Sequence, residues 1–234
     1  MAGASTLNRS IVMNTKLWKS LVALSCIYLG LSCTLHYMVF PEPEPPEDLF
    51  PRAGERVVNQ SAGEEILFLK DRFSGDPNKV TIQVDLRAGG SVPNAHVHGS
   101  MNEVFIGLKG EASLALYESK HTLRPRTRAL VPAGAAHLPA NPGDKPARFQ
   151  VEMEPIGVFD LCLVQIHSLM DEPKENRNWI SEQMQLARMA TFCDVYRGEI
   201  PVWIQKAGLF FMDPTLRALG FPRWRIKAKA APAP

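Results

Sequence analysis

Short apolar runs alternate with turn residues between positions 56 and 153. The runs lie at 65–69, 80–86, 104–109, 112–117, 128–131 and 148–153. Within 80–86, the polar residues Thr81, Gln83 and Asp85 alternate with apolar ones, so one face of this strand should be buried and the other wet. Short strands at such regular spacing favour a single antiparallel barrel or sandwich.

The pattern changes beyond Pro155, where apolar positions recur every three or four residues. The residues at this spacing are Ile180, Met184, Leu186, Met189, Phe192 and Val195. A further apolar stretch covers 200–219, but Lys206, Asp213 and Pro214 interrupt it, so we do not expect it to span a membrane. This spacing predicts helices that cover the barrel or a partner subunit.

Residues 20–40 contain no Lys, Arg, Asp or Glu. As a helix they would reach roughly 30 Å, which is enough to cross a bilayer. Arg9, Lys16 and Lys19 precede the segment and acidic residues follow it, so the positive-inside rule predicts a cytoplasmic N-terminus and an extracytoplasmic barrel. The alternatives are a cleaved signal peptide and a lipoprotein cysteine at Cys33. We favour a retained single-pass anchor, because the apolar run is long and continues past Cys33.

These patterns divide the chain into five parts. They are a cytoplasmic stub (1–19), a transmembrane helix (20–40), an acidic Pro-rich linker (41–55), a barrel (56–153) and a helical C-terminal extension with a basic tail (154–234). The membrane is therefore an expected partner. Nucleic acid is not, because the net charge is only +2 and no basic residues interleave with aromatic ones in the barrel.

Two cysteines, Cys162 and Cys193, belong to the soluble part of the chain. An extracytoplasmic location would permit a disulfide between them. Two buried free thiols are the alternative, and the sequence does not decide between the two.

Three histidines and one glutamate form the strongest chemical signal. His96 and His98 project to the same face of an extended strand. Glu103 follows a turn-forming stretch and opens an apolar strand, whereas His137 follows a Pro-x-Gly turn that can aim it back into the same cavity. Imidazole and carboxylate ligands together suit a divalent transition metal such as Fe, Mn, Ni, Cu, Co or Zn.

The spacing of these residues resembles the two motifs of the cupin superfamily. The first motif is carried by Gly90, His96, His98, Glu103 and Gly110, and the second by Pro132, Gly134, His137 and Asn141. The second motif of that family opens with a glycine, where this chain has Arg126, so the local loop geometry is in question. The resemblance is to single-barrel, type-2-like cupins with a helical extension, and it implies a mainly β, jelly-roll-like antiparallel barrel (a double-stranded β-helix).

By the same resemblance, His96, His98, Glu103 and His137 would hold the metal. The open coordination positions would allow a dioxygenase, isomerase or decarboxylase type of reaction on a small oxygenated molecule. The alternative is a non-enzymatic barrel that binds or senses a small ligand and is stabilised by its metal. The resemblance also makes a homodimer a candidate assembly.

Phe105 and Gly107 share the strand face of Glu103, so we expect both to line the pocket. No second acid or base stands at motif spacing, and we assign no catalytic residue. The three other histidines, His36, His121 and His167, are expected to be hydrogen-bonded core residues.

Overall fold

The computed structural model describes residues 15–92, 94–117, 119–170, 178–225 and 231–232. The chain forms two compact units, Met1–Pro43 and Glu44–Pro234. In the first unit, α1 (Thr15–Thr34) continues into a π-helical segment, Leu35–Val39. The span Leu17–Val39 is long and apolar enough to cross a membrane, and it covers nearly all of the segment predicted at 20–40.

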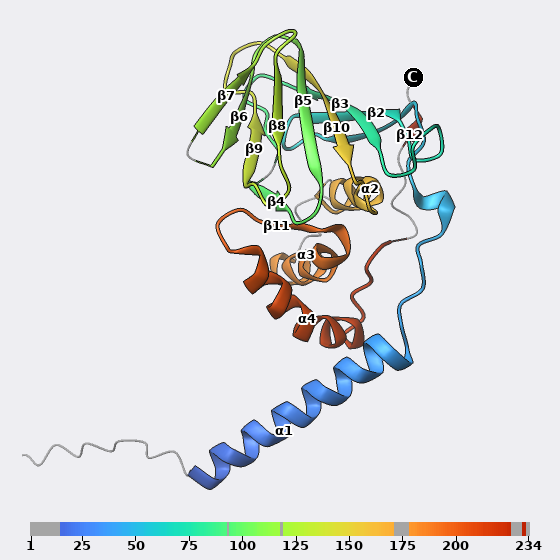
Figure 1. Ribbon diagram of the computed structural model, residues 1–234, viewed down its shortest axis with the longest axis vertical. Coiled ribbons are helices and arrows are strands. Elements are labelled where there is room, and N and C mark those ends of the chain that lie inside the picture. The colour runs from blue at the N-terminus through green and yellow to red at the C-terminus, as the bar shows by residue number, and fades with distance from the viewer. Residues whose placement is uncertain (1–14, 93, 118, 171–177, 226–230, 233–234) are drawn as a thin grey trace, which may run out of the picture. The chain divides into compact units, whose positions relative to one another are not determined.

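Two antiparallel sheets form the second unit (Figure 1). In spatial order, the first contains β12 (Ala231–Pro232), β1 (Glu55–Asn59), β2 (Glu64–Lys70), β3 (Val80–Leu86), β10 (Ala147–Glu154), β5 (Asn102–Lys109) and β8 (Arg128–Val131). The second contains β11 (Val195–Arg197), β4 (His96–His98), β9 (His137–Ala140), β6 (Ala112–Leu116) and β7 (Ser119–Leu123). This arrangement confirms the predicted mainly β, cupin-type fold.

The inward faces of the two sheets enclose one apolar core. Phe68, Phe105, Phe149 and Leu114 are among its fully buried side chains. Each side chain of this size stabilises the fold by about 1.5–3 kcal/mol when it leaves water completely. The core thus holds the strands that carry the polar site in fixed positions.

All six apolar runs predicted as strands are strands, and β3 and β8 have the predicted bounds. The sequence missed β7, in which Leu123 is the one buried side chain. This strand pairs only with β6 at the end of its sheet, so its other residues face solvent and show no apolar alternation. His121 lies on β7 and is exposed, so its expected core position was wrong.

Arg126, which occupies the motif position of a glycine, lies in the turn before β8. This residue has a φ of 72°, in the left-handed region that glycine adopts most readily. Its backbone N–H donates to the Gly107 carbonyl at 3.0 Å, and the Gly107 N–H donates to the Thr127 carbonyl at 3.0 Å. The glycine-type turn is therefore formed by an arginine.

Among the described residues after the barrel, three helices are formed: α2 (Phe159–Met170), α3 (Trp179–Cys193) and α4 (Val202–Ala218). Figure 1 shows β11 beside β4 and next to these helices. A disulfide joins Cys162 of α2 to Cys193 of α3, which decides between the two alternatives for these cysteines. The extension is not purely helical, because β11 and β12 extend the two sheets of the barrel.

A buried ion pair links α3 to α4, with Arg188 bonded to Asp213. Arg223 also pairs with Asp213, at 2.8 Å, so this arginine of the predicted basic tail belongs to the packed structure. Lys227 and Lys229 of the same tail lie outside the described residues.

Candidate metal centre

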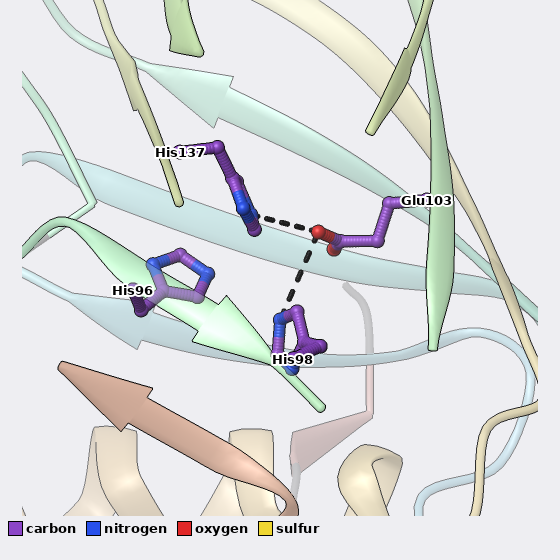
Figure 2. A group of neighbouring side chains, drawn as sticks. All are labelled: His96, His98, Glu103 and His137. Atoms are coloured by element: carbon purple, nitrogen blue, oxygen red, sulfur yellow. Dashed lines mark ion pairs between the residues drawn. The ribbon is translucent and has the colours of Figure 1, made fainter. Parts of the chain in front are cut away.

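Three strands bring the four predicted ligands together. His96 and His98 lie on β4, and His137 begins β9, directly opposite His96 in the antiparallel register. Glu103 lies at the start of β5 in the other sheet. One ligand atom from each of the four residues lies within 4.8 Å of the others. Figure 2 shows the Glu103 carboxylate joined by ion pairs to His98 and His137, with the His96 ring on the far side of these two rings.

The carboxylate oxygen Oε2 of Glu103 lies between two imidazoles. It is 2.7 Å from Nε2 of His137 and 3.7 Å from Nε2 of His98. Glu103 is 5% exposed, and each of these two histidines is 2% exposed. His96 is partly buried and lies at the edge of an adjoining cavity.

Backbone carbonyls orient all three rings. The Nδ1 contacts are His96 to Asn94 O at 3.0 Å, His98 to Asp194 O at 3.3 Å and His137 to Ala135 O at 3.1 Å. A carbonyl oxygen only accepts hydrogen bonds, so each Nδ1 carries a proton and each Nε2 is directed into the cluster. Such contacts fix the tautomer and orientation of metal-binding histidines.

The sequence analysis missed the contribution of Asp194. This residue directly precedes β11, which pairs with β4, and it comes from the C-terminal extension, 96 residues away from His98. Its carboxylate also accepts hydrogen bonds from the backbone N–H and hydroxyl of Ser100, which fix the turn between β4 and β5. No local sequence signal marks these contacts, because they depend on how β11 pairs.

The protonation states of the metal-free cluster follow from burial and mutual charge. Burial, together with charge on the other two histidines, lowers the pKa of His96 to about 3, and burial also lowers the pKa of His98. For Glu103, burial would raise the pKa, but the surrounding imidazoles outweigh it and lower the pKa to about 2. For His137, burial would lower the pKa, but the bond and charge of Glu103 outweigh it and raise the pKa.

The cluster contains polar atoms that the described chain leaves unsatisfied. Apart from their contacts with one another, Nε2 of His98, Nε2 of His137 and Oε2 of Glu103 are buried without a hydrogen-bond partner among the described residues. Buried polar atoms in folded proteins nearly always have a partner. Ligand atoms of three imidazoles and a carboxylate within 4.8 Å of one another fit a divalent transition metal.

A cavity of about 620 Å³ adjoins the cluster. His96, Glu103 and Phe105 line it on the barrel side, and residues of α2, α3 and α4 form the opposite wall. Its lining is mainly aliphatic, aromatic and methionine side chains. Its size lies within the range of cavities that bind small organic molecules.

Gly107 does not line the cavity, although it shares the strand face of Phe105. A Cβ added at Gly107 would lie 2.1 Å from the backbone oxygen of Arg124. The space beside Gly107 is therefore filled by the backbone of the turn before β8, and the expected pocket role of this glycine is corrected to close packing.

A second polar pair on the cavity wall was also missed. Nε2 of His167, on α2, lies 3.0 Å from Oε2 of Glu64, on β2. Both residues line the cavity, with exposures of 5% and 4%. His167 is a buried, hydrogen-bonded histidine as predicted, but its position on the cavity wall was not foreseen. The two residues are 103 positions apart, so no motif could reveal the pair.

Comparison with known proteins identifies the barrel region. The family model of the cupin domain matches residues 82–154. No curated protein matches the chain.

Several solved structures are similar to part of the chain. The TT1209 protein from Thermus thermophilus is 30% identical over 33% of this chain and 72% of its own, with a TM-score of 0.32. A sugar phosphate isomerase of the cupin superfamily from Silicibacter pomeroyi is 24% identical over 48% and 75%, with a TM-score of 0.38. A predicted oxalate decarboxylase from Thermotoga maritima is 18% identical over 39% and 80%, with a TM-score of 0.37.

Proposed function

The chain belongs to the cupin superfamily, and on that basis we propose that it is a membrane-anchored protein that binds a divalent transition metal. His96, His98, Glu103 and His137 would hold the ion, and the adjoining cavity would bind a small oxygenated molecule. The observation that carries this proposal is the set of four ligand atoms within 4.8 Å of one another, three of which are buried with no hydrogen-bond partner outside the cluster among the described residues.

The chain's own residues would prepare the site for a reaction of the dioxygenase, isomerase or decarboxylase type. A bound ion would supply Lewis-acid or redox chemistry to an oxygen atom of the substrate. His96 and Glu103 line the cavity, so the open side of the cluster faces it. The phenyl ring of Phe159 stands edge-on to the ring of His98, with centroids 4.4 Å apart, and excludes water from that side.

Elemental analysis of the purified full-length protein tests the metal site. We expect about one transition-metal ion per chain in the wild type and none in the double variant His96→Ala/His137→Ala. His121→Ala is the matched control, because this exposed histidine lies outside the cluster and should leave the metal content unchanged. Unchanged metal content in the double variant would overturn the assignment.

A non-enzymatic binding barrel is the second candidate, and the mainly apolar lining of the cavity favours it. In this case the metal would stabilise the fold and orient the ligand. Substrate-dependent oxygen uptake or product formation by the metal-loaded protein supports the enzyme. Saturable binding of the same compound without product supports the binding barrel.

We also propose that the chain spans the membrane once, with its N-terminus in the cytoplasm and the barrel outside. The support is the apolar span, the basic residues before it and the acidic residues after it. The Cys162–Cys193 disulfide agrees with an oxidising compartment. A reporter fused after Pro46 should be active only outside the cytoplasm, and activity only inside would refute this orientation.

A further inference from the structure

Helix α2 forms one long side of the cavity. Phe159, Leu163, Ile166, His167 and Met170 line it, and their spacing places them on one face of the helix. Phe159, at one end of this face, contacts His98 of the metal cluster, whereas His167, near the other end, bonds Glu64. Eight residues separate Phe159 from His167, so these two positions lie about 12 Å apart along the axis of α2.

The strands separate the two groups further. Glu103 pairs with Met153, which pairs with Val80 at the start of β3. Glu64 instead pairs with Leu86, at the end of β3, so the two carboxylate positions are offset by about 20 Å along the strand direction. The strand residues that line the cavity beside them are apolar and include Ile66, Ile82, Val84, Phe149 and Val151. The strand wall of the cavity therefore carries two separate polar groups on an otherwise apolar surface.

The Glu64–His167 pair can recognise a hydrogen-bond donor. Nδ1 of His167 donates to the Leu163 carbonyl at 2.8 Å, so one further proton lies between Nε2 of His167 and Oε2 of Glu64. Within the part of the chain that the structure describes, His167 is the only hydrogen-bond partner of the Glu64 side chain. The second carboxyl oxygen of Glu64 thus remains an acceptor on the cavity wall, whichever partner holds the shared proton.

We infer that the cavity binds an elongated molecule with an oxygen-bearing head at the metal cluster, an apolar chain along α2 and a hydroxyl tail that donates to Glu64. A zigzag chain of about ten carbon atoms covers the distance of about 12 Å along α2, and one of about sixteen covers the offset of about 20 Å along the strands. The ligand class is therefore an ω-hydroxy fatty acid of about ten to sixteen carbon atoms. This inference rests on the proposed metal site for the head, whereas the tail site stands on Glu64 and His167 alone.

Competition between a hydroxylated fatty acid and its unsubstituted parent tests the tail site, with 10-hydroxydecanoate against decanoate and 16-hydroxyhexadecanoate against hexadecanoate. Both probes of a pair are offered to the full-length protein in lipid nanodiscs, and the bound ratio is read by native mass spectrometry. Glu64→Met removes the acceptor, and Glu65→Met is the matched control. Glu65 is the next residue of β2 and forms an ion pair with Arg56, outside the cavity lining. Dividing the ratio of one variant by that of the other cancels the partitioning of the probes into lipid.

We expect the wild type and Glu65→Met to prefer the hydroxylated probe about tenfold, the effect of one hydrogen bond to a buried carboxyl group. Glu64→Met should lose this preference while it still binds decanoate, which also shows that the variant is folded. Equal binding of the two probes by the wild type would overturn the inference without reference to any variant.

A probe with one polar end separates this inference from the proposed metal site. In chelator-treated protein, 1-decanol should bind Glu65→Met more tightly than Glu64→Met, because its hydroxyl can donate to Glu64 without metal. A preserved difference between these variants in a protein that never binds metal would overturn the proposed function and leave the tail site standing. Bound metal without any hydroxyl preference would overturn the tail site alone.

Discussion

Metal uptake at pH 5.5 should release one proton per ion, and not the three expected for three ordinary histidines. In the absence of an ion, the pKa of His96 is about 3 and that of Glu103 is about 2, so both are deprotonated at pH 5.5, and burial lowers the pKa of His98 and favours its neutral form as well. The pKa of His137 is raised, so this ring still carries a proton on Nε2. An ion can bind Nε2 of His137 only by displacing that proton.

The magnitude follows from this proton count. When pH falls below the pKa of His137, the dissociation constant of the metal should rise about tenfold per pH unit, because one proton competes with the ion. Three unperturbed imidazoles would instead weaken binding by about a thousandfold per unit below pH 6.5. Above the pKa of His137, the affinity should no longer depend on this group.

Isothermal titration calorimetry measures the proton count directly. Zn²⁺ is titrated into the metal-free protein at pH 5.5 in two buffers that differ in ionisation enthalpy, and the difference in heat gives the protons released. His121→Ala should give the same count as the wild type, because this ring is remote from the cluster. Release of two or more protons, or of none, would refute the assigned protonation states.

Three further predictions concern stability and the cavity. Cys162→Ser should lower the free energy of unfolding by about 3 kcal/mol, because the bond to Cys193 closes a long loop. Thermal unfolding with and without reductant measures this. If reductant lowered the stability of the variant as much as that of the wild type, the prediction would be contradicted. Gly107→Ala should lower the free energy of unfolding by about 1–3 kcal/mol, as measured by chemical denaturation, because the new methyl group would clash with the backbone of Arg124. An unchanged denaturation midpoint would show that the turn moves freely. Leu163→Trp should fill the middle of the cavity and abolish decanoate binding while the metal content stays constant, and retained binding would place the chain of the ligand elsewhere.

The cluster could be predicted from the sequence because its determinants are local. His96 and His98 share a face through strand parity, and turns aim Glu103 and His137 at them. The same parity argument placed Phe105 on the cavity wall, where it lies. The argument was wrong for Gly107. Strand parity predicts the face on which a residue lies, but it does not predict that the backbone of Arg124 packs against that face.

The rest of the site depends on contacts between distant segments. The carbonyl of Asp194 reaches His98 only because β11 pairs with β4. Glu64 meets His167 only because α2 packs across the barrel. Neither contact leaves a periodic or spaced pattern in the chain, so the shape of the cavity and its second polar group required the structure.

The pairing of β11 with β4 makes the helical extension and the metal cluster parts of one thermodynamic unit. Strand β4 supplies two of the four cluster residues, and β11 precedes α4, which helps to wall the cavity. An ion that holds β4 in place would therefore also hold β11 and the helices on either side of it. A barrel cut free of its extension would lose the partner strand of β4 and the carbonyl that orients His98, so the smallest functional fragment should include α2, α3, β11 and α4.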